Sequence, residues 1–274
     1  MSKFLIFIFF LIISGQRLVG QRHNFMSRSE IGFMGGGTYY IGDLNPSKQF
    51  QNTQIAGGLM FRHTIHSRFS IRASLLYGSV KADDALSNNL LLNNRNLSFS
   101  SSIFELSTNV EFTYLPFEVG HNKYKGTAYL TVGLGVFKMN PMTTYEGNNI
   151  ALQPLGTEGQ SSSLGASQSY SLNQLCIPFG IGVKGSLSKR LALSVEFGIR
   201  KTFTDYLDDV HSNTYINTAQ LSDVNGTISS SLSNRSLDGN NNGFRGDPST
   251  KDWYIFSGVM LSIRLGDPSN CFYH

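Results

Sequence analysis

The chain has 274 residues, a formal net charge of +4, 15% charged residues, 12% aromatic residues and 28 glycines. All-β barrels often use this length for one domain, so the length does not require a second domain. Lysine and arginine are scattered along the chain. The sequence therefore lacks the clustered basic residues of a nucleic-acid-binding protein, and no nucleic-acid partner is expected.

Residues 1–20 have the features of a signal peptide. The apolar run FLIFIFFLII at residues 4–13 follows Lys3, is too short to span a bilayer and precedes a segment that contains small residues. We expect cleavage to leave residues 21–274 as the mature barrel domain. The alternative is that the segment stays attached as an N-terminal membrane anchor.

Apolar and polar residues alternate along most of the remaining chain, whereas helical periodicity is nearly absent. Alternation with a period of two predicts β-strands. Eight segments show it, near residues 29–41, 53–64, 68–79, 102–115, 126–138, 171–184, 190–203 and 252–265. Each is long enough to cross a bilayer at a tilt, whereas strands of soluble proteins are commonly about half as long. In the seventh segment, Val195 and Phe197 share an apolar face, and Glu196 lies on the other face.

The connections between these segments alternate in length. Short ones are expected at 65–67, 116–125 and 185–190, and long ones at 80–101, 139–170 and 204–251. In outer-membrane barrels the short turns are periplasmic and the long loops are extracellular. We therefore predict an all-β fold, an eight-stranded antiparallel transmembrane β-barrel of the outer membrane. Residues 204–251 are too polar to pack by themselves and are expected to form an exposed extracellular loop.

Aromatic residues lie at or near the ends of the predicted strands. They are Tyr39, Tyr40, Tyr77, Tyr114, Trp253 and Tyr254. Membrane barrels carry such residues in girdles at the two membrane interfaces, whereas aromatic residues also favour strands in general. We expect these six side chains to form the two girdles.

The polar faces of the strands carry eight ionisable residues that would point into the barrel: Arg62, Arg72, Glu105, Glu111, Lys184, Glu196, Arg200 and Arg264. An eight-stranded barrel is filled by its own side chains, and buried charges must pair. We predict one network of Glu, Arg and Lys in the lumen. The alternative is a hydrolytic pair of Glu105 and Glu111, but these lie about 20 Å apart along a strand, whereas such pairs need about 5–10 Å.

Three carboxylates, Asp205, Asp208 and Asp209, follow the seventh strand in the stretch RKTFTDYLDDV. We expect them at the extracellular rim of the barrel. There they would be solvated, cap a helical turn, pair with cations such as Lys201, or bind Ca²⁺ through their oxygen atoms. Their spacing is not that of an EF-hand loop, so they are a candidate cation site without a recognised motif.

The sequence indicates no further chemistry. The six histidines show no zinc-ligand spacing, and the serine-rich stretches lack a GxSxG nucleophile elbow. Cys176 is expected in a strand and Cys271 in the tail, so no disulfide is expected. We predict that the protein has no catalytic residue, no cofactor and no recognised metal-binding motif, and that it is not an enzyme.

Five stretches occur in the order EIGFMGGGTYYIGDLNP, RNLSF, LQPLGTEGQ, IPFGIGVK and RKTFTDYLDDV. Together they resemble a family of outer-membrane β-barrel proteins of the Bacteroidota that includes PorG, the barrel protein of the type IX secretion system. The resemblance covers about residues 29–266. It implies an outer-membrane location, no enzymatic activity and contact, from the periplasmic side, with the ring formed by a lipoprotein and its partner. The short connections and the tail at 266–274 would make that contact.

The sequence thus favours a non-catalytic component of type IX protein secretion that lies among outer-membrane lipids. Two alternatives stay open: a structural or adhesive barrel that acts through its extracellular loops, and a small ligand or ion barrel. A soluble lipocalin-like binder would instead turn the apolar faces inward. That arrangement would leave Arg72, Glu105, Glu111 and Glu196 outside the barrel.

Overall fold

The structure, a computed structural model, describes residues 28–160, 162–164, 168–240 and 243–266. The expected signal peptide at 1–20 and Cys271 lie outside the described residues. Cys176 is buried and its thiol is free.

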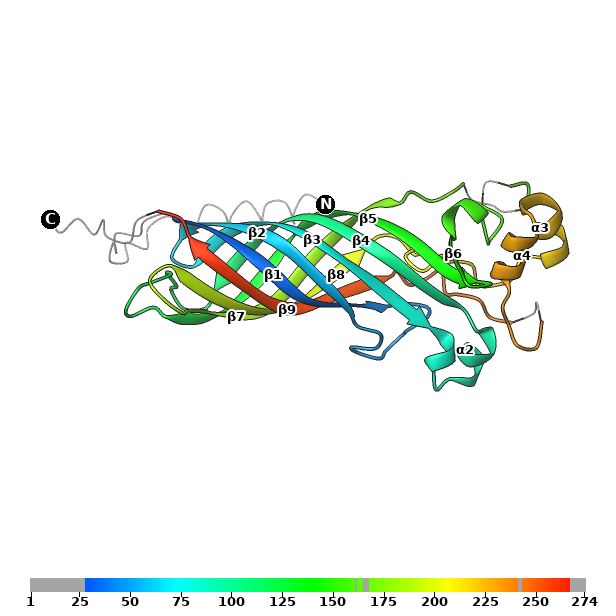
Figure 1. Cartoon of the computed structure of the whole chain (residues 1–274), viewed down its shortest axis with the longest axis horizontal. Helices are drawn as coiled ribbons and strands as arrows, with labels where there is room; N and C mark the ends of the chain where they lie inside the picture. Colours follow the sequence, from blue (N-terminus) through cyan, green and yellow to red (C-terminus); the bar gives the residue numbers. More distant parts are fainter. Residues whose placement is uncertain (1–27, 161, 165–167, 241–242, 267–274) are drawn as a thin grey trace, which may run out of the picture.

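Eight antiparallel strands close into a barrel, as Figure 1 shows. Around the wall they are β1 (Arg28–Ile41), β2 (Gln54–His66), β3 (Phe69–Asp83), β4 (Ser98–Thr113), β5 (Gly126–Tyr145), β7 (Asn173–Ser186), β8 (Leu191–Thr202) and β9 (Trp253–Arg264). The barrel closes because β9 pairs with β1. The predicted eight-stranded antiparallel barrel is therefore confirmed.

One strand is much longer than the sequence pattern predicts. The segment expected at 126–138 continues to Tyr145, and its last residues pair with β6 (Asn148–Ala151) in a hairpin beyond the barrel. Asn140 and Pro141 interrupt the apolar alternation there, although both remain paired with β4. The hydrogen-bonded partner strand, rather than local composition, extends β5.

Alternation decides which side chains face the interior of the barrel. On β8, Leu193 and Val195 are exposed on the outer surface, whereas Ser194 and Glu196 are only 1% exposed. Isoleucine, leucine, valine and phenylalanine cover the outer surface of the other strands in the same way. A lipocalin-like barrel would have the opposite arrangement, so that alternative is wrong.

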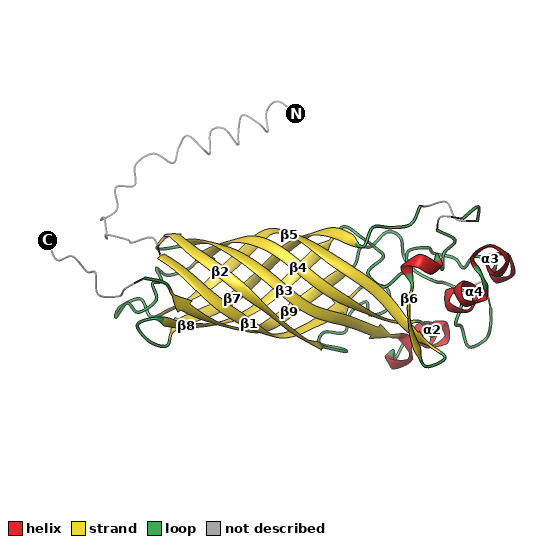
Figure 2. Ribbon diagram, turned by 45° about the horizontal axis from the view of Figure 1, so that its top comes forward, coloured by secondary structure: helices red, strands yellow, loops and turns green. Residues whose placement is uncertain are grey.

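The strands are strongly tilted, as Figure 2 shows. Paired residues can be followed around the wall from Ser29 on β1, through Val132 on β5 and Ile199 on β8, back to Tyr39 on β1. The path therefore returns ten positions further along β1 than it began. This stagger and the number of strands together fix a narrow barrel that side chains can fill.

The two ends of the barrel differ. At the turn end, short connections join β2 to β3, β4 to β5 and β7 to β8. The first residue of β1 and the last residue of β9 also lie at this end. At the loop end, the described residues within 42–53, 84–97, 146–172 and 203–252 form a folded cap (Figure 1). The cap contains η1 (Asp84–Leu86), α2 (Leu90–Arg95), η2 (Gln153–Leu155), α3 (Thr218–Asn225) and α4 (Thr227–Ser233). Among the described residues, none of the helices is both long and apolar enough to cross a membrane.

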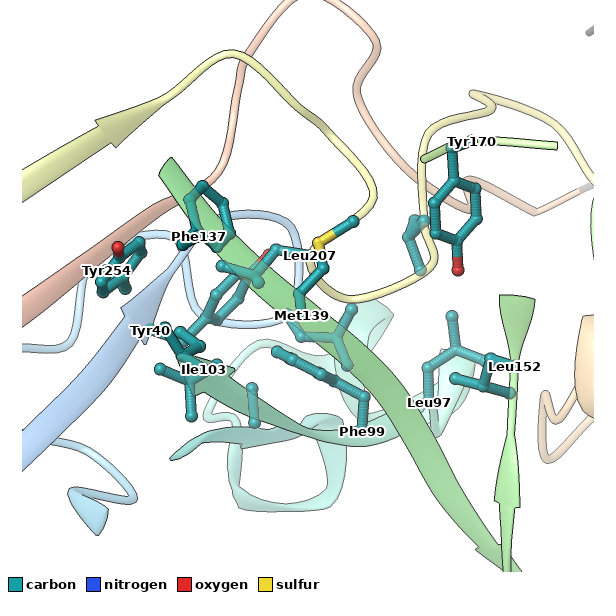
Figure 3. Packing of buried hydrophobic residues seen from close by; sticks show 14 of the residues in the cluster. Tyr40, Leu97, Phe99, Ile103, Phe137, Met139, Leu152, Tyr170, Leu207 and Tyr254 are labelled. Atoms are coloured by element: carbon teal, nitrogen blue, oxygen red, sulfur yellow. The ribbon is translucent and has the colours of Figure 1, made fainter. Parts of the chain in front are cut away.

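The expectation that residues 204–251 form an exposed loop is met only in part, because several of its residues are buried. Leu207 and Leu232 from this segment lie in one buried apolar cluster with Phe99 and Tyr254 of the strands, as the close view in Figure 3 shows for most of these residues. The segment contains few apolar residues of its own. It folds because the barrel mouth supplies the rest of the core, which the composition of the segment alone does not reveal.

Candidate functional site: the barrel interior and its cap

Glu111 on β4 is the centre of an ion-pair network inside the barrel. Its carboxylate oxygens lie 2.9 Å from Nε of Arg62, 3.0 Å from Nη1 of Arg72 and 2.9 Å from Nζ of Lys184. Arg72 also pairs with Glu196 at 2.6 Å. These residues come from β2, β3, β4, β7 and β8, so the network connects distant parts of the wall.

Glu30 on β1 completes this network, and sequence reasoning missed it. Its carboxylate lies 2.9 Å from Arg62 and accepts a hydrogen bond from Ser262 at 2.7 Å. The signal was present, because Glu30 precedes the outward-facing Ile31 in the alternating pattern of the first strand. With Glu30, the network contains three carboxylates and three cations and is neutral as a whole. Neutrality limits the cost of keeping these charges out of water.

A second ion pair lies closer to the loop end. Arg200 on β8 lies 3.1 Å from Glu105 on β4, and the hydroxyl of Tyr254 donates to the same carboxylate at 2.9 Å. Arg264 lies at the turn end and donates to the backbone carbonyl of Val119 at 2.6 Å. Direct ion pairs therefore join five of the eight predicted residues around Glu111 and place Glu105 and Arg200 in a second group. That all eight form one network stays a prediction.

Apolar side chains fill the space beside these charges. A buried layer in the interior consists of Met34, Ala56, Met60, Leu76, Phe256 and Met260. At the turn end, Phe117 and Val119 of the β4–β5 connection are buried, and Nζ of Lys184 lies 5.3 Å from the ring centroid of Phe117. The interior is therefore packed with side chains near both ends, which favours a plugged barrel over an open channel.

Asp208, from the stretch RKTFTDYLDDV, meets Asp252 at a single tyrosine, Tyr40 of β1. The hydroxyl of Tyr40 lies 2.6 Å from Oδ2 of Asp208 and 2.7 Å from Oδ1 of Asp252. The other two carboxylate oxygens accept hydrogen bonds from the backbone N–H groups of Val210 and Leu207. One hydroxyl has one proton to donate, so the second carboxyl group bonds to Tyr40 through a proton of its own.

Asp209 and Asp205 have other partners. Asp209 accepts hydrogen bonds from the hydroxyls of Tyr170 at 2.6 Å and Thr157 at 2.5 Å, and Asp205 lies 2.6 Å from Nδ1 of His211. Asp205, Asp208 and Asp209 are each no more than 3% exposed. The expectation that they lie solvated at the rim is therefore wrong, because the cap folds over them.

Burial changes the protonation of these carboxyl groups. It raises the pKa of Asp208 well above its usual value, and the nearby charges of Asp252 and Asp43 raise it further. Burial likewise raises the pKa of Asp252, with a further contribution from neighbouring aspartates. Burial raises the pKa of Asp209 to about 6, against the opposing effect of the hydrogen bonds that it accepts. As the pH rises above 3.8, the ordinary pKa of an aspartate, the folded cap therefore keeps protons that an unfolded chain releases.

The aspartates do not converge on one point. Within the part of the chain that the structure describes, no group of three or more His, Cys, Asp and Glu side chains is placed to hold a metal ion. Asp208 and Asp209 instead accept hydrogen bonds from tyrosines of different segments. The arrangement supports a structural role for these carboxyl groups, which is to connect the cap to the barrel.

Buried arginines link the segments of the cap. Arg95 on α2 lies 2.7 Å from Asp84, donates to the backbone carbonyl of Asp43 at 3.0 Å and also donates to the carbonyl of Arg245. Arg245 in turn lies 2.6 Å from Glu158. Sequence reasoning missed these contacts, because the partners come from separate loops and no local pattern marks them.

The aromatic residues follow the expected girdles only in part. Tyr77 and Tyr114 are 63% and 72% exposed on the outer surface. Tyr40 and Tyr254 instead point into the interior, and Tyr39 is covered by Phe50 of the cap, with ring centroids 5.1 Å apart. Neighbouring residues of a strand face opposite sides, so Tyr39 and Tyr40 could not both belong to a girdle.

A closed eight-stranded barrel with an apolar outer surface and a filled, charged interior has the fold of an outer-membrane β-barrel protein. The chain belongs to the family described as Domain of unknown function (DUF6089), which matches residues 2–227. No curated protein matches its sequence.

Solved outer-membrane proteins resemble the fold at low identity. A major outer membrane protein from Thermus thermophilus is 12% identical, with 88% of this chain and 100% of that chain covered and a TM-score of 0.42. Neisserial surface protein A is 7% identical, with 87% and 97% covered and a TM-score of 0.40. Ail, the attachment invasion locus protein of Yersinia pestis, is 8% identical, with 87% and 97% covered and a TM-score of 0.39. These similarities concern the fold alone.

Proposed function

We propose that the protein is a non-catalytic component of the outer membrane, which it spans as a barrel. The outer surface supports this proposal. On β8 the outward-facing residues from Leu191 to Ile199 are apolar, and Lys201 follows them. Nine residues of a strand tilted by about 40° cover about 23 Å, which is close to the height of a lipid-facing band. By the usual rule for such barrels, the turn end faces the periplasm and the cap faces outward.

We further propose that this barrel serves type IX protein secretion. The carrying observation is that three of the five stretches behind the sequence resemblance meet in one place. Tyr40 of EIGFMGGGTYYIGDLNP bonds to Asp208 of RKTFTDYLDDV, and Thr157 of LQPLGTEGQ bonds to Asp209 of the same stretch. These contacts hold the cap on the barrel. A filled and capped barrel acts through its surfaces, which suits a docking or structural component of a secretion machine.

The turn end supplies the surface for the periplasmic ring lipoprotein and its partner. Arg68, Lys123, Lys125 and Lys189 are exposed there. Glu118 at this end pairs with Arg28 at 2.8 Å. The surface therefore favours an acidic partner, because complementary charge speeds and orients association.

Secretion by a deletion strain tests this proposal. Mass spectrometry would compare the culture medium and the periplasm, with and without complementation by the full chain. We expect proteins with type IX sorting domains to leave the medium, accumulate in the periplasm and return to the medium on complementation. An unchanged secretome would overturn the secretion role and leave the barrel fold intact.

Charge reversal at the turn end tests the docking surface separately. Lys123→Glu/Lys125→Glu should fail to complement the deletion, although the barrel still shows heat-modifiable gel migration. Lys48→Glu/Lys81→Glu, at exposed positions near the loop end, reverses the same amount of charge and should complement fully. Full complementation by Lys123→Glu/Lys125→Glu would exclude this surface as the contact with the ring.

Exposed leucines favour a second candidate function, a structural or adhesive role of the cap. Leu90 and Leu91 on α2 are 84% and 74% exposed. Leu237 is 68% exposed, and its N–H donates to the carbonyl of Asn94 beside the same helix. An exposed apolar patch is typical of a binding surface. Under this alternative, Leu90→Ser/Leu91→Ser would reduce surface attachment of the cells and leave the secretome unchanged.

A further inference from the structure

Two exposed lysines end the apolar outer wall near the loop end. On β5 the outward-facing Val136 is followed by Lys138, and on β8 the outward-facing Ile199 is followed by Lys201. Only β7 lies between these two strands. At these two lysines the apolar, lipid-facing band ends and charged residues begin, as is typical of the membrane interface of a barrel.

The two lysines lie at nearly the same depth along the barrel axis. Lys138 pairs with Asn173 on β7, whereas Lys201 pairs with Ile177, four positions nearer the turn end. Because of the stagger, paired residues on successive strands do not lie at the same depth: from β5 to β8 the paired position moves about 2.5 residues toward the loop end. Subtracting this shift from the four positions leaves a difference in depth between the two lysines of about 4 Å. Two strand spacings and four positions along the strands together separate the two Cα atoms by about 16 Å along the wall.

The positive charge of this pair is not neutralised by the described part of the chain. Neither Lys138 nor Lys201 forms an ion pair with another described residue, and Nζ of Lys201 lies 5.7 Å from the ring centroid of Trp253. Lys81 on β3 is also exposed, but Asp83 lies on the same strand face two residues further along. Lys138 and Lys201 are therefore the pair that is best placed to receive an anion at this interface.

An apolar groove begins beside Lys201, at Ile199 of β8, and crosses β5 at Val132, six residues below Lys138. It has a volume of about 650 Å³, and Val132, Phe179 and Ile199 form its upper row. A second groove of about 560 Å³ continues it toward the turn end. The two share Phe112, Leu130, Ile181 and Phe197. The ring of Trp253 packs edge-on against Phe179 at 6.1 Å and so connects the groove with the site of the lysines.

We propose that Lys138 and Lys201 bind the phosphates of one lipid A molecule of the outer leaflet, and that the groove holds one of its acyl chains. Lipid A is a disaccharide with phosphates at its two ends and several acyl chains, so its headgroup spans the distance between the lysines. Ammonium groups bind phosphate through charge-assisted hydrogen bonds. An acidic protein would use the lysines but not the apolar groove beside them, and this favours a lipid.

Trp253 makes the proposal testable, because it is the single tryptophan of the chain. The full-length protein, refolded in detergent micelles, is titrated with lipid A that carries two phosphates, and the emission of Trp253 is recorded. Native mass spectrometry counts the bound lipid independently. We expect saturable binding of one lipid A per barrel, and Lys138→Gln/Lys201→Gln should raise the Kd at least tenfold. Val132→Phe, which fills the upper row of the groove, should also weaken binding.

Lys125→Gln/Lys189→Gln is the matched control, because it removes the same charge from the opposite end of the barrel. It should change the Kd less than twofold. The proposal is overturned if Lys138→Gln/Lys201→Gln binds like the wild type or if both double variants lose affinity equally. It is also overturned if phosphatidylglycerol, or lipid A without phosphates, binds as tightly as lipid A with both phosphates. Heat-modifiable migration verifies that every variant is folded.

Discussion

Glu111 on β4 and Lys184 on β7 meet inside the barrel at 2.9 Å, although 73 residues separate them in the chain. Arg62 and Arg72 bind the same carboxylate, so one negative charge faces three positive ones. Glu30 and Glu196 provide the other two negative charges of the network. Glu111 is therefore the residue whose loss would disturb the balance of charge most.

Glu111→Gln should destabilise the barrel strongly. It leaves three buried cations with two carboxylates, and breaking a buried ion pair by removing one partner costs about 3–5 kcal/mol. Urea unfolding in detergent micelles, followed by Trp253 emission, measures the change. Glu146→Gln, on the exposed β5–β6 turn, is the control and should change the free energy of unfolding by less than about 0.5 kcal/mol. A similarly small effect for Glu111→Gln would show that the network does not stabilise the fold.

Lys184→Met should partly rescue Glu111→Gln. The double variant leaves Arg62 and Arg72 with Glu30 and Glu196, so the network is neutral again. Residues in one ion-pair network are coupled, and we expect the double variant to be more stable than the sum of the single changes predicts, by about 1–3 kcal/mol. A double-mutant cycle from urea titrations gives this coupling. Additive effects would mean that the two side chains act independently.

The barrel could be predicted from the sequence because the alternation of apolar and polar residues within one strand shows which side chains lie on each of its two faces. Val195 and Glu196 on β8 show which face meets lipid and which faces inward, with no knowledge of other strands. The same pattern contained Glu30, which was overlooked. The pattern did not predict the continuation of β5 through Asn140 and Pro141, because pairing with β4, and not the local composition, extends the strand there.

The cap could not be predicted, because its contacts join residues that are far apart in the sequence. Arg95 donates to the carbonyl of Arg245 in another loop, and Asp208 meets Tyr40 of the first strand. From its composition alone, a polar segment with three aspartates is expected to be exposed to solvent. Its burial depends on the apolar barrel mouth beneath it, which only the closed barrel creates.

Arg95→Lys should loosen the cap and leave the barrel intact. The guanidinium of Arg95 bonds to Asp84 and to two backbone carbonyls, and a single ammonium group cannot reach all three. Losing one or two of these hydrogen bonds costs about 2 kcal/mol locally. Hydrogen exchange should accelerate in residues 84–97, whereas exchange in the strands should not change. Arg68→Lys, at the exposed turn end, is the control, and equal exchange in both variants would argue against the bridging role of Arg95.

The cap should be more stable at pH 5 than at pH 8. Burial raises the pKa of Asp209 and of Asp43 to about 6, above the usual value of 3.8, and raises those of Asp208 and Asp252 as well. The folded cap then binds more protons than the unfolded chain, so this contribution to stability is complete below about 3.8 and is lost as the pH rises through about 6. Hydrogen exchange of residues 203–240, corrected for the intrinsic dependence on pH, should show weaker protection at pH 8. Stronger protection at pH 8 would contradict the assignment.

Asp208→Asn should weaken this dependence on pH. Its amide group can donate to the hydroxyl oxygen of Tyr40 while Tyr40 donates to Asp252, and its carbonyl oxygen can still accept from the N–H of Val210. The variant thus reproduces the arrangement in which one of the two carboxyl groups holds a proton, without titrating. We expect its cap to be better protected than the wild type at pH 8 and similar at pH 5. Tyr40→Phe provides the contrast, because it removes the shared donor and should weaken protection at both pH values.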